Sequence, residues 1–239
     1  MTEETFTKQM RKATREIHAI SDALVNAKLA FALSDNSVWA EGLLVFYEIF
    51  RYLEEAMVRL KDTHVGKLCI EGMQRTESFE KDLSFYLGSD WAKDYKPRES
   101  VVKYLLHLRE LENSDPDQLV AYIYHLYMGL MSGGQILRKK RVVFSKFTSS
   151  QQTYEDAVTD FGENSIPNMK KDLMTAMNGI AEVLNEETKQ KLIEESKTVF
   201  VLNNEIIRSV RGANEVILKK IIILIIIISL IIVVYYTIF

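Results

Sequence analysis

The chain has 239 residues and a formal net charge of −3, with 10 glycines, 3 prolines and one cysteine. So few glycines and prolines leave too little turn chemistry for a β-sandwich or barrel, which needs a turn about every 8–12 residues. The single cysteine excludes an internal disulfide and a cysteine-based metal cluster, and the near-neutral charge gives no electrostatic basis for binding nucleic acid.

Apolar residues recur at helical spacing along most of the chain, and no period-two stretch is long enough to predict a strand. Asp115 and Pro116 have the pattern of an N-cap followed by proline in the first helical turn. The predicted helices cover residues 6–25, 38–59, 78–87, 97–111, 153–161, 168–184 and 185–210. The sequence therefore predicts one all-α domain.

An uncharged stretch of 20 residues lies between Asp117 and Arg138 and contains Gly129, Gly133 and Gly134. A second membrane span is an alternative, but three clustered glycines and several polar-tipped side chains favour a buried helix. Each glycine in a helix interior costs about 1 kcal/mol relative to alanine. Either a close helix–helix crossing or a large planar ligand against the backbone would offset that cost.

His18 is the candidate ligand on the first helix. A lone helical histidine is more often structural, yet neutral imidazole is the commonest protein ligand of haem iron. Arg11 and Arg15 lie one and two turns earlier and could neutralise carboxylates on the same ligand, or could form a solvated basic face. We expect three other histidines to be structural: His64, His107 and His125.

Residues 221–239 contain 19 uncharged positions, 10 of them isoleucine. A helix of this length is roughly 28 Å long, close to the hydrocarbon thickness of a bilayer. A buried core helix is the alternative, but this segment has no polar face. A cationic flank precedes it and two tyrosines lie near its end, as expected for a span that leaves the body in the cytosol. These residues are Arg208, Arg211, Lys219, Lys220, Tyr235 and Tyr236. The acidic N-terminus does not resemble a signal peptide.

Four motifs in chain order carry a resemblance to a known family: RKATREIH at 11–18, FEKDLSFYLG at 79–88, YMGLMSGGQ at 127–135 and IEESKTVF at 193–200. With the apolar tail, the chain resembles the membrane-anchored eukaryotic haem oxygenases from about Lys8 to Asn203. The resemblance implies a haem oxygenase-like catalytic domain over residues 1–203. A basic juxtamembrane linker over 204–220 and a transmembrane anchor over 221–239 would follow.

The resemblance also implies an activity. Members of this family bind haem as both cofactor and substrate, and cleave it with O₂ to biliverdin, CO and ferrous iron. Electrons come from NADPH through NADPH–cytochrome P450 reductase, and biliverdin reductase is a further downstream partner. We expect a tail-anchored protein of the endoplasmic reticulum membrane rather than the mitochondrial outer membrane.

Individual roles follow from the family motifs. His18 would bind the iron and Asp22 would orient its imidazole. The catalytic backbone at Gly129 and Gly133 would lie over the ring and crowd O₂ against one edge. The residues implied for the haem propionates are Arg11, Arg15, Tyr124, and Lys170 or Lys171.

This chain departs from the family pattern at the distal polar network. Leu130 replaces an aspartate that holds a proton-donating water, and Leu126 and Phe50 replace an arginine and a tyrosine of the same network. Met174 falls where the family has a propionate-binding arginine. We therefore expect a slow haem oxygenase with relaxed regiochemistry. The alternatives are a non-enzymatic haem-binding or haem-sensing membrane protein, and a helical adaptor without haem. Cys69 is expected to be a small core residue.

Overall fold

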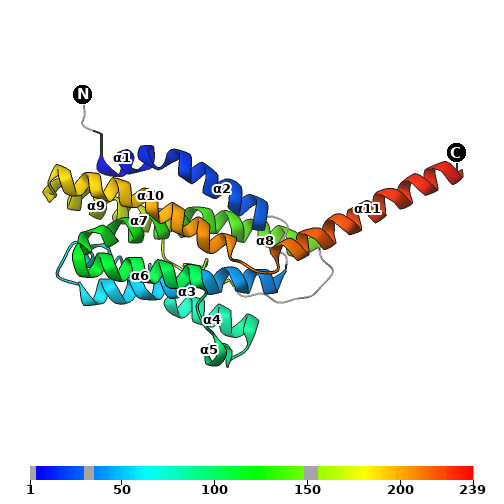
Figure 1. Cartoon of the computed structure of the whole chain (residues 1–239), viewed down its shortest axis with the longest axis horizontal. Helices are drawn as coiled ribbons and strands as arrows, with labels where there is room; N and C mark the ends of the chain where they lie inside the picture. The colour runs from blue at the N-terminus through cyan, green and yellow to red at the C-terminus, as the bar shows by residue number, and fades with distance from the viewer. Residues whose placement is uncertain (1–3, 30–34, 148–155, 239) are drawn as a thin grey trace.

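The computed structural model describes residues 4–29, 35–147 and 156–238, and within those residues it contains helices and turns but no strand (Figure 1). The all-α prediction is confirmed. The helices are α1 (Phe6–Ala13), α2 (Arg15–Leu29), α3 (Asn36–Arg59), α4 (Thr76–Leu87), α5 (Trp91–Asp94), α6 (Glu99–Ser114), α7 (Leu119–Gly129), α8 (Gln135–Phe147), α9 (Ile166–Val183), α10 (Glu186–Arg208) and α11 (Ala213–Ile238). Short 3₁₀ turns η1 (Gly66–Leu68) and η2 (Pro116–Gln118) and a π-helical turn η3 (Leu130–Gly134) join some of them.

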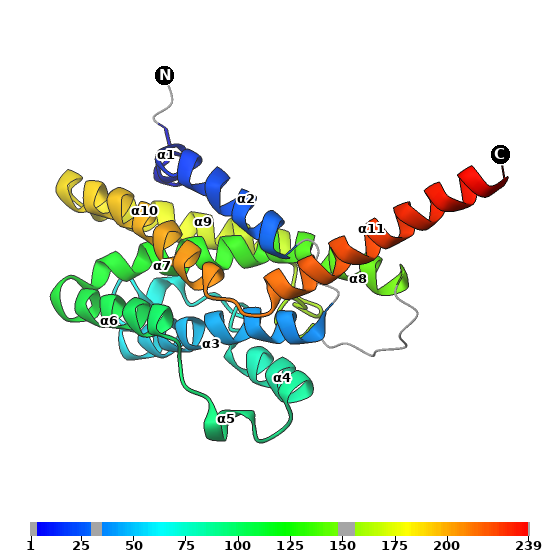
Figure 2. The same ribbon diagram turned by 45° about the vertical axis from the view of Figure 1, so that its right-hand side comes forward.

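Helix α10 runs through the middle of the body. It packs against α2 on one side and against α6 and α7 on the other, while α3 packs on α4 and α6 (Figures 1 and 2). Apolar side chains at helical spacing form a core between these helices. The rings of Tyr104, Tyr122 and Tyr127 are fully buried within it. Helix α10 therefore sets the separation between α2 and α7.

The first predicted helix, residues 6–25, is divided at Thr14. Its hydroxyl donates to the carbonyl oxygen of Met10 at 2.9 Å, and Thr14 is buried. Such a bond from threonine to the preceding turn competes with helix geometry and bends the chain. The bend separates α1 from α2, so that α1 reaches α9 while α2 lies along α10.

The helix predicted over residues 153–161 is wrong for its described part, because residues 156–161 form turns. The buried carboxylate of Asp82 accepts the backbone N–H groups of Ala157 and Val158 at 2.9 and 3.0 Å. Gly162 follows with a φ of +56°, which no right-handed helix allows. Residues 153–155 lie outside the described residues.

Side-chain caps account for several helix starts. Asp35 accepts the backbone N–H groups of Ser37 and Val38 at the start of α3, and Asn185 accepts that of Thr188 at the start of α10. Asp115 occupies the N-cap position of η2 with Pro116 in its first turn, as predicted, but its carboxylate accepts the side-chain amide of Gln118 at 3.2 Å instead of a backbone N–H.

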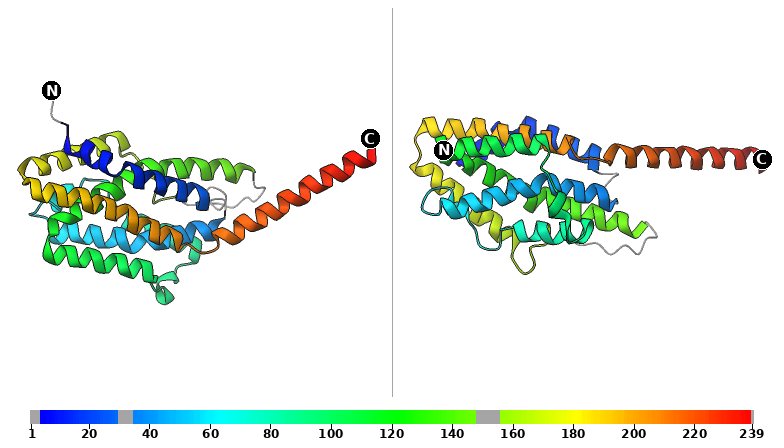
Figure 3. Two further views of the ribbon diagram at one scale, coloured as in Figure 1. Left: turned by 45° about the horizontal axis from the view of Figure 1, so that its top comes forward. Right: turned by 60° about the horizontal axis from the view of Figure 1, so that its bottom comes forward.

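Helix α11 extends away from the body (Figures 1 and 3). Its segment Asn214–Tyr235 has a mean hydropathy of 3.1 and no buried residues, and is the one helix in the described chain long and apolar enough to cross a membrane. The other uncharged stretch is instead core: Tyr122, Ile123 and Tyr127 are fully buried. The domain boundaries at 203/204 and 220/221 stay a prediction.

Only residues 209–212 separate α10 from α11, and the body holds this connector. Arg98, at the start of α6, donates to the carbonyl oxygen of Ser209 and pairs with Glu41. Glu41 also accepts the backbone N–H of Arg211 at 3.3 Å. Helix α11 therefore leaves the body at a connector that these contacts hold in place.

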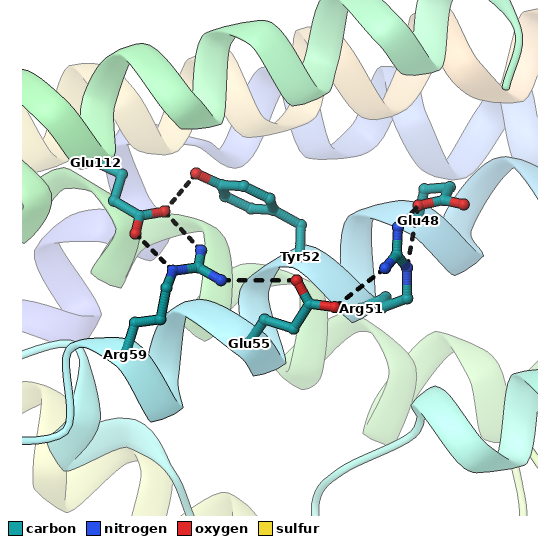
Figure 4. A network of polar contacts seen from close by, with 6 residues as sticks. All are labelled: Glu48, Arg51, Tyr52, Glu55, Arg59 and Glu112. Atoms are coloured by element: carbon teal, nitrogen blue, oxygen red, sulfur yellow. Dashed lines mark hydrogen bonds and ion pairs between the residues drawn. The ribbon is translucent and has the colours of Figure 1, made fainter.

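A ladder of alternating charges runs along α3 and crosses to α6 (Figure 4). At the crossing, the Glu112 carboxylate accepts bonds from Arg59 Nε and Nη2 at 2.9 and 2.8 Å, and another from the Tyr52 hydroxyl. The hydrogen bonds from the Arg59 guanidinium hold the pKa of Glu112 below its usual value. Glu112 therefore ties α6 to α3 in its ionised form.

We predict that Glu112→Gln lowers the free energy of unfolding at neutral pH by about 1 kcal/mol. Because the pKa of Glu112 is lowered in the folded state, its contribution is present above the unfolded pKa and is lost as the pH falls through the folded value. The difference between wild type and variant should therefore shrink in acid, as measured by thermal unfolding across a pH series. The exposed neighbour Glu110 supplies the control, Glu110→Gln. An equal loss at neutral and acidic pH would contradict this role.

Candidate functional site

Helix α2 presents His18 to solvent, with 54% of its side chain exposed. One turn later, the Asp22 carboxylate lies 3.1 Å from His18 Nδ1. This contact orients the imidazole and favours a proton on Nδ1, which leaves Nε2 as the nitrogen able to bind a metal. The pairing of His18 with Asp22 expected from the sequence is present in the structure.

The ring of Phe200 on α10 lies between the two helices that the sequence connects with a ligand. Its centroid is 5.2 Å from that of His18 on α2 and 5.1 Å from that of His125 on α7. Sequence reasoning left His125 among the structural histidines and gave Phe200 no role. Spacing alone could have drawn attention to His125, because it precedes Gly129 by four residues, one helical turn.

His125 differs from the other histidines in its surroundings. It keeps a little exposure, but Nε2 is sealed from solvent and has no hydrogen-bond partner among the described residues. Burial lowers the pKa of His125 to about 3, with a smaller electrostatic contribution from nearby His18. His125 is therefore a neutral imidazole at physiological pH.

The backbone of α7 and η3 is bare at two glycines. A Cβ added at Gly129 or at Gly133 would meet no described atom within 4 Å, and both residues are exposed. Gly134, by contrast, is buried, and a Cβ there would lie 3.1 Å from Leu130 Cδ1. Of the two explanations left open by the sequence, a close protein contact applies to Gly134, whereas Gly129 and Gly133 offer an open face to a ligand. The π-helical turn that bends the chain here is a feature often found at functional sites.

The wall next to this glycine face is apolar. Phe50 and Leu126 are 3% and 5% exposed, and Leu130 is half-buried against the core. The Tyr127 hydroxyl, the nearest polar tip on α7, donates to Glu54 Oε1 at 2.6 Å. Aromatic packing fills the rest of the wall, where the ring centroids of Phe50 and Tyr127 are 5.2 Å apart. The side chains of Phe50, Leu126 and Leu130 therefore offer no hydrogen-bond donor or acceptor to this part of the wall.

The predicted propionate residues divide into two groups. Tyr124 is buried beside Arg11: burial raises the pKa of its hydroxyl, and the positive charge of Arg11 lowers it. Arg15 is exposed on α2, while Lys170 is half-buried and Lys171 exposed on α9. The structure brings Arg11 and Tyr124 together, and the part played by the other three cations stays a prediction.

Met174 lies on α9, one turn after Lys170, with 39% of its surface exposed. The backbone N–H of Thr7 on α1 donates to the Asn178 side chain at 3.0 Å, so α9 is joined to the helix that carries Arg11. A thioether at position 174 offers no hydrogen-bond donor to a carboxylate.

The expectation that Cys69 is a core residue is wrong, because its side chain is exposed. It follows the short turn η1 and accepts a hydrogen bond from Gln74 Nε2 at 3.3 Å. Cys69 also lines a hollow of about 500 Å³, together with residues that include Asn164 and Asp172. Cys69 is exposed because of its position directly after η1, which its residue type alone does not indicate.

The sequence model of the family described as "Heme oxygenase" matches residues 4–209. The heme oxygenase of Rhodella violacea is 25% identical over 204 residues, covering 84% of this chain and 85% of the relative. Heme oxygenase 1 of Bos taurus is 27% identical over 209 residues, covering 85% of this chain and 70% of the relative.

Solved structures agree. Heme oxygenase 2 from Chlamydomonas reinhardtii without heme superposes with a TM-score of 0.77 at 29% identity, covering 87% of this chain and 98% of that one. Heme oxygenase-1 from the cyanobacterium Synechocystis in complex with heme shares the fold, with a TM-score of 0.77 at 24% identity over 95% of this chain and all of that one. The helical body and its glycine-bearing turn are those of one class of protein, and the chain belongs to the haem oxygenase family.

We predict that Gly129→Ala raises the free energy of unfolding of the haem-free protein by about 1 kcal/mol, because nothing obstructs the added Cβ and alanine favours the helix. Gly179→Ala on α9 is the matched control, since a Cβ there is equally unobstructed and the same gain is expected. Gly134→Ala should gain less, because Leu130 has to move. Chemical denaturation of the three variants measures this. A destabilised Gly129→Ala would show that the glycine serves the protein's own packing.

Proposed function

We propose that the protein is a haem oxygenase that cleaves haem with O₂ to biliverdin, CO and ferrous iron, using electrons from NADPH through NADPH–cytochrome P450 reductase. One observation carries the proposal. An exposed imidazole, His18, is held by a carboxylate on α2, and bare backbone is exposed at Gly129 and Gly133 on α7 and η3. Both helices pack on α10, which supports assigning the two features to one site.

The residues present fit a haem. Imidazole is the ligand that haem iron takes most often in proteins, and Asp22 leaves Nε2 of His18 available. The open face at Gly129 and Gly133 accepts a flat ring that any side chain would hold away. Arg11, Tyr124 and one of the α9 lysines would bind the propionates by charge-assisted hydrogen bonds.

Haem, when bound, supplies the iron that activates O₂ and is itself the molecule cleaved. The protein's own contribution is to fix the ring and to control water and protons around it. Phe50, Leu126 and Leu130 would line the haem site with apolar side chains and offer no proton donor there. A site that cannot deliver protons promptly works slowly, and the weakened clamp at Met174 lets haem adopt more than one in-plane rotation. We therefore infer slow turnover with relaxed regiospecificity.

A non-enzymatic haem-binding or haem-sensing protein is the second candidate. The observation that favours it is the same apolar wall, because the loss of three polar members removes the proton relay together with any water it held. This candidate shares His18 and the glycine face, but yields neither biliverdin nor CO.

We expect the full-length protein, loaded with haem and supplied with reductase, NADPH and O₂, to lose its Soret band slowly and to yield more than one biliverdin isomer. His18→Ala should abolish this by removing the iron ligand. His64→Ala is the control, since His64 instead contacts Asp117 at 3.0 Å. Absorption spectroscopy and chromatography of the products provide the readout. Haem bound with no biliverdin supports the second candidate, whereas one isomer formed rapidly contradicts the inferred regiospecificity.

We further propose that α11 anchors the protein in the endoplasmic reticulum membrane with the body in the cytosol. The support is an apolar, unburied helix with basic residues, Arg211 and Lys219, on its body side. Ile226→Arg with Ile231→Arg should abolish carbonate-resistant membrane association, because each central arginine costs about 2.5–3.5 kcal/mol.

The matched control for the anchor is Val58→Arg, an exposed apolar position on the body that should leave fractionation unchanged. Protease added to intact microsomes should digest the body and spare α11. A wild-type chain extracted by carbonate, or a body protected from protease, would contradict the anchor or its orientation.

A further inference from the structure

Helix α8 is basic along its whole length. Its 13 residues, Gln135–Phe147, carry arginine or lysine at positions 138–141 and 146 and no acidic residue. Helices that combine cations with apolar side chains in this way are typical of segments that lie on membrane surfaces. The proposed function uses only the glycine turn that precedes α8, so the composition of this helix needs an explanation of its own.

Two arginines hold one face of α8 against the body. Arg141 is 2% exposed, and its guanidinium donates to the Tyr86 hydroxyl at 2.8 Å and to the Asn36 side chain at 2.7 Å. Arg138 donates to Asp160 Oδ2 at 2.7 Å. The two arginines are three residues apart and therefore share a helix face. Their charges serve the attachment of α8 to the rest of the body.

The opposite face of α8 is open to solvent. Ile136 and Val143 are 56% and 52% exposed, and Lys139 between them is also exposed. Spacings of three, four and seven residues place Lys139 and Lys140 on the same stripe as the two aliphatic side chains. Lys140 is half-buried and donates to the Asn26 side chain at 2.8 Å. This outer face of α8 (residues 136, 139, 140 and 143) alternates cations with apolar groups, which suits the boundary between lipid headgroups and acyl chains.

The position of α8 brings its outer face to the part of the body from which α11 leaves. Both helices point toward the same end of the molecule (Figures 1 and 3). The uncharged run of α11 begins at Ile221, eight residues after α11 begins at Ala213, which is a rise of about 12 Å. Because Arg98 and Glu41 hold the connector, this end of the body stays close to the headgroups of a bilayer that α11 spans.

We propose that the outer face of α8 is a second membrane contact, which binds anionic phospholipid headgroups through Lys139 and Lys140 and places Ile136 and Val143 at the interface. The proposal rests on the proposed anchoring by α11 and does not depend on haem. Anionic lipids fit because this helix has no acidic residue of its own, and because the cytosolic leaflet carries a negative surface potential. A body attached at two points cannot rotate about the axis of α11.

The test uses the full-length protein in nanodiscs whose lipids carry a spin label near the headgroup, which quenches a nearby fluorophore. Cys69→Ser with Val143→Cys places a single fluorophore on the outer face of α8. The native chain labelled at Cys69 is the matched control, because this only cysteine is exposed and follows the last turn of α3, whereas Arg141 ties α8 to the first residue of that helix. With phosphatidylserine present, we expect strong quenching at position 143 and little at Cys69.

Charge variants test the chemistry of the contact. Lys139→Gln, which leaves the bond from Lys140 to Asn26 in place, should lower the ratio of quenched to unquenched label about fivefold, and adding Lys140→Gln should lower it about thirtyfold in all. Lys61→Gln with Lys67→Gln removes the same charge from exposed positions after α3 and should change nothing. Discs of phosphatidylcholine alone should quench position 143 as weakly as the double variant at α8.

Two results overturn the proposal. One is a label at position 143 that is quenched no more than the label at Cys69, and the other is quenching that is equal in both lipids and insensitive to the lysines. An unquenched position 143, together with slower reduction by the reductase in the lysine variants, would assign this face to an acidic protein and also overturns it.

A label at the start of the membrane span separates this proposal from the anchor. Cys69→Ser with Ile222→Cys reports whether α11 is inserted, and we expect that label to be quenched in both lipids. If position 222 is quenched and position 143 is not, the α8 contact fails and the anchor stands. If neither is quenched, both fail.

Discussion

The candidate site depends on how one phenyl ring packs against two imidazoles. Phe200 lies on α10, the helix on which both α2 and α7 pack, and its ring contacts those of His18 and His125. Aromatic rings resist compression, so this contact sets how closely the two helices approach. The space for a planar ligand is thus fixed by the core, and the ligand itself does not have to create it.

The apolar wall stands where the family resemblance implies a polar network. A buried relay with one member removed leaves its other donors and acceptors unsatisfied, which is worse than having no relay. Here Phe50, Leu126 and Leu130 are all apolar, and the hydroxyl of Tyr127 donates to Glu54. Glu54 also accepts the backbone N–H groups of Arg75 and Thr76, so this polarity serves the fold rather than the ligand.

Helical periodicity was sufficient to predict the fold class and most helices, because apolar spacing is a local property. The bend at Thr14 and the turns at 156–161 could not be predicted this way. The first depends on one hydroxyl, and the second on a carboxylate, Asp82, that is 75 positions away in sequence. In the site, His18 and Asp22 are one turn apart and were found. The surroundings of His125 could not be predicted, because its isolation from hydrogen-bond partners is a tertiary property.

The short, pinned connector between α10 and α11 has a mechanical consequence. Arg98 and Glu41 hold residues 209–212, so α11 cannot swing freely relative to the body. In the proposed membrane-anchored form, the direction in which the glycine face opens is set relative to the membrane plane. An electron donor that diffuses laterally in the same membrane would then always approach the same face of the body. The donor would then search for the body in the two dimensions of the membrane, with the orientation of the body already largely set.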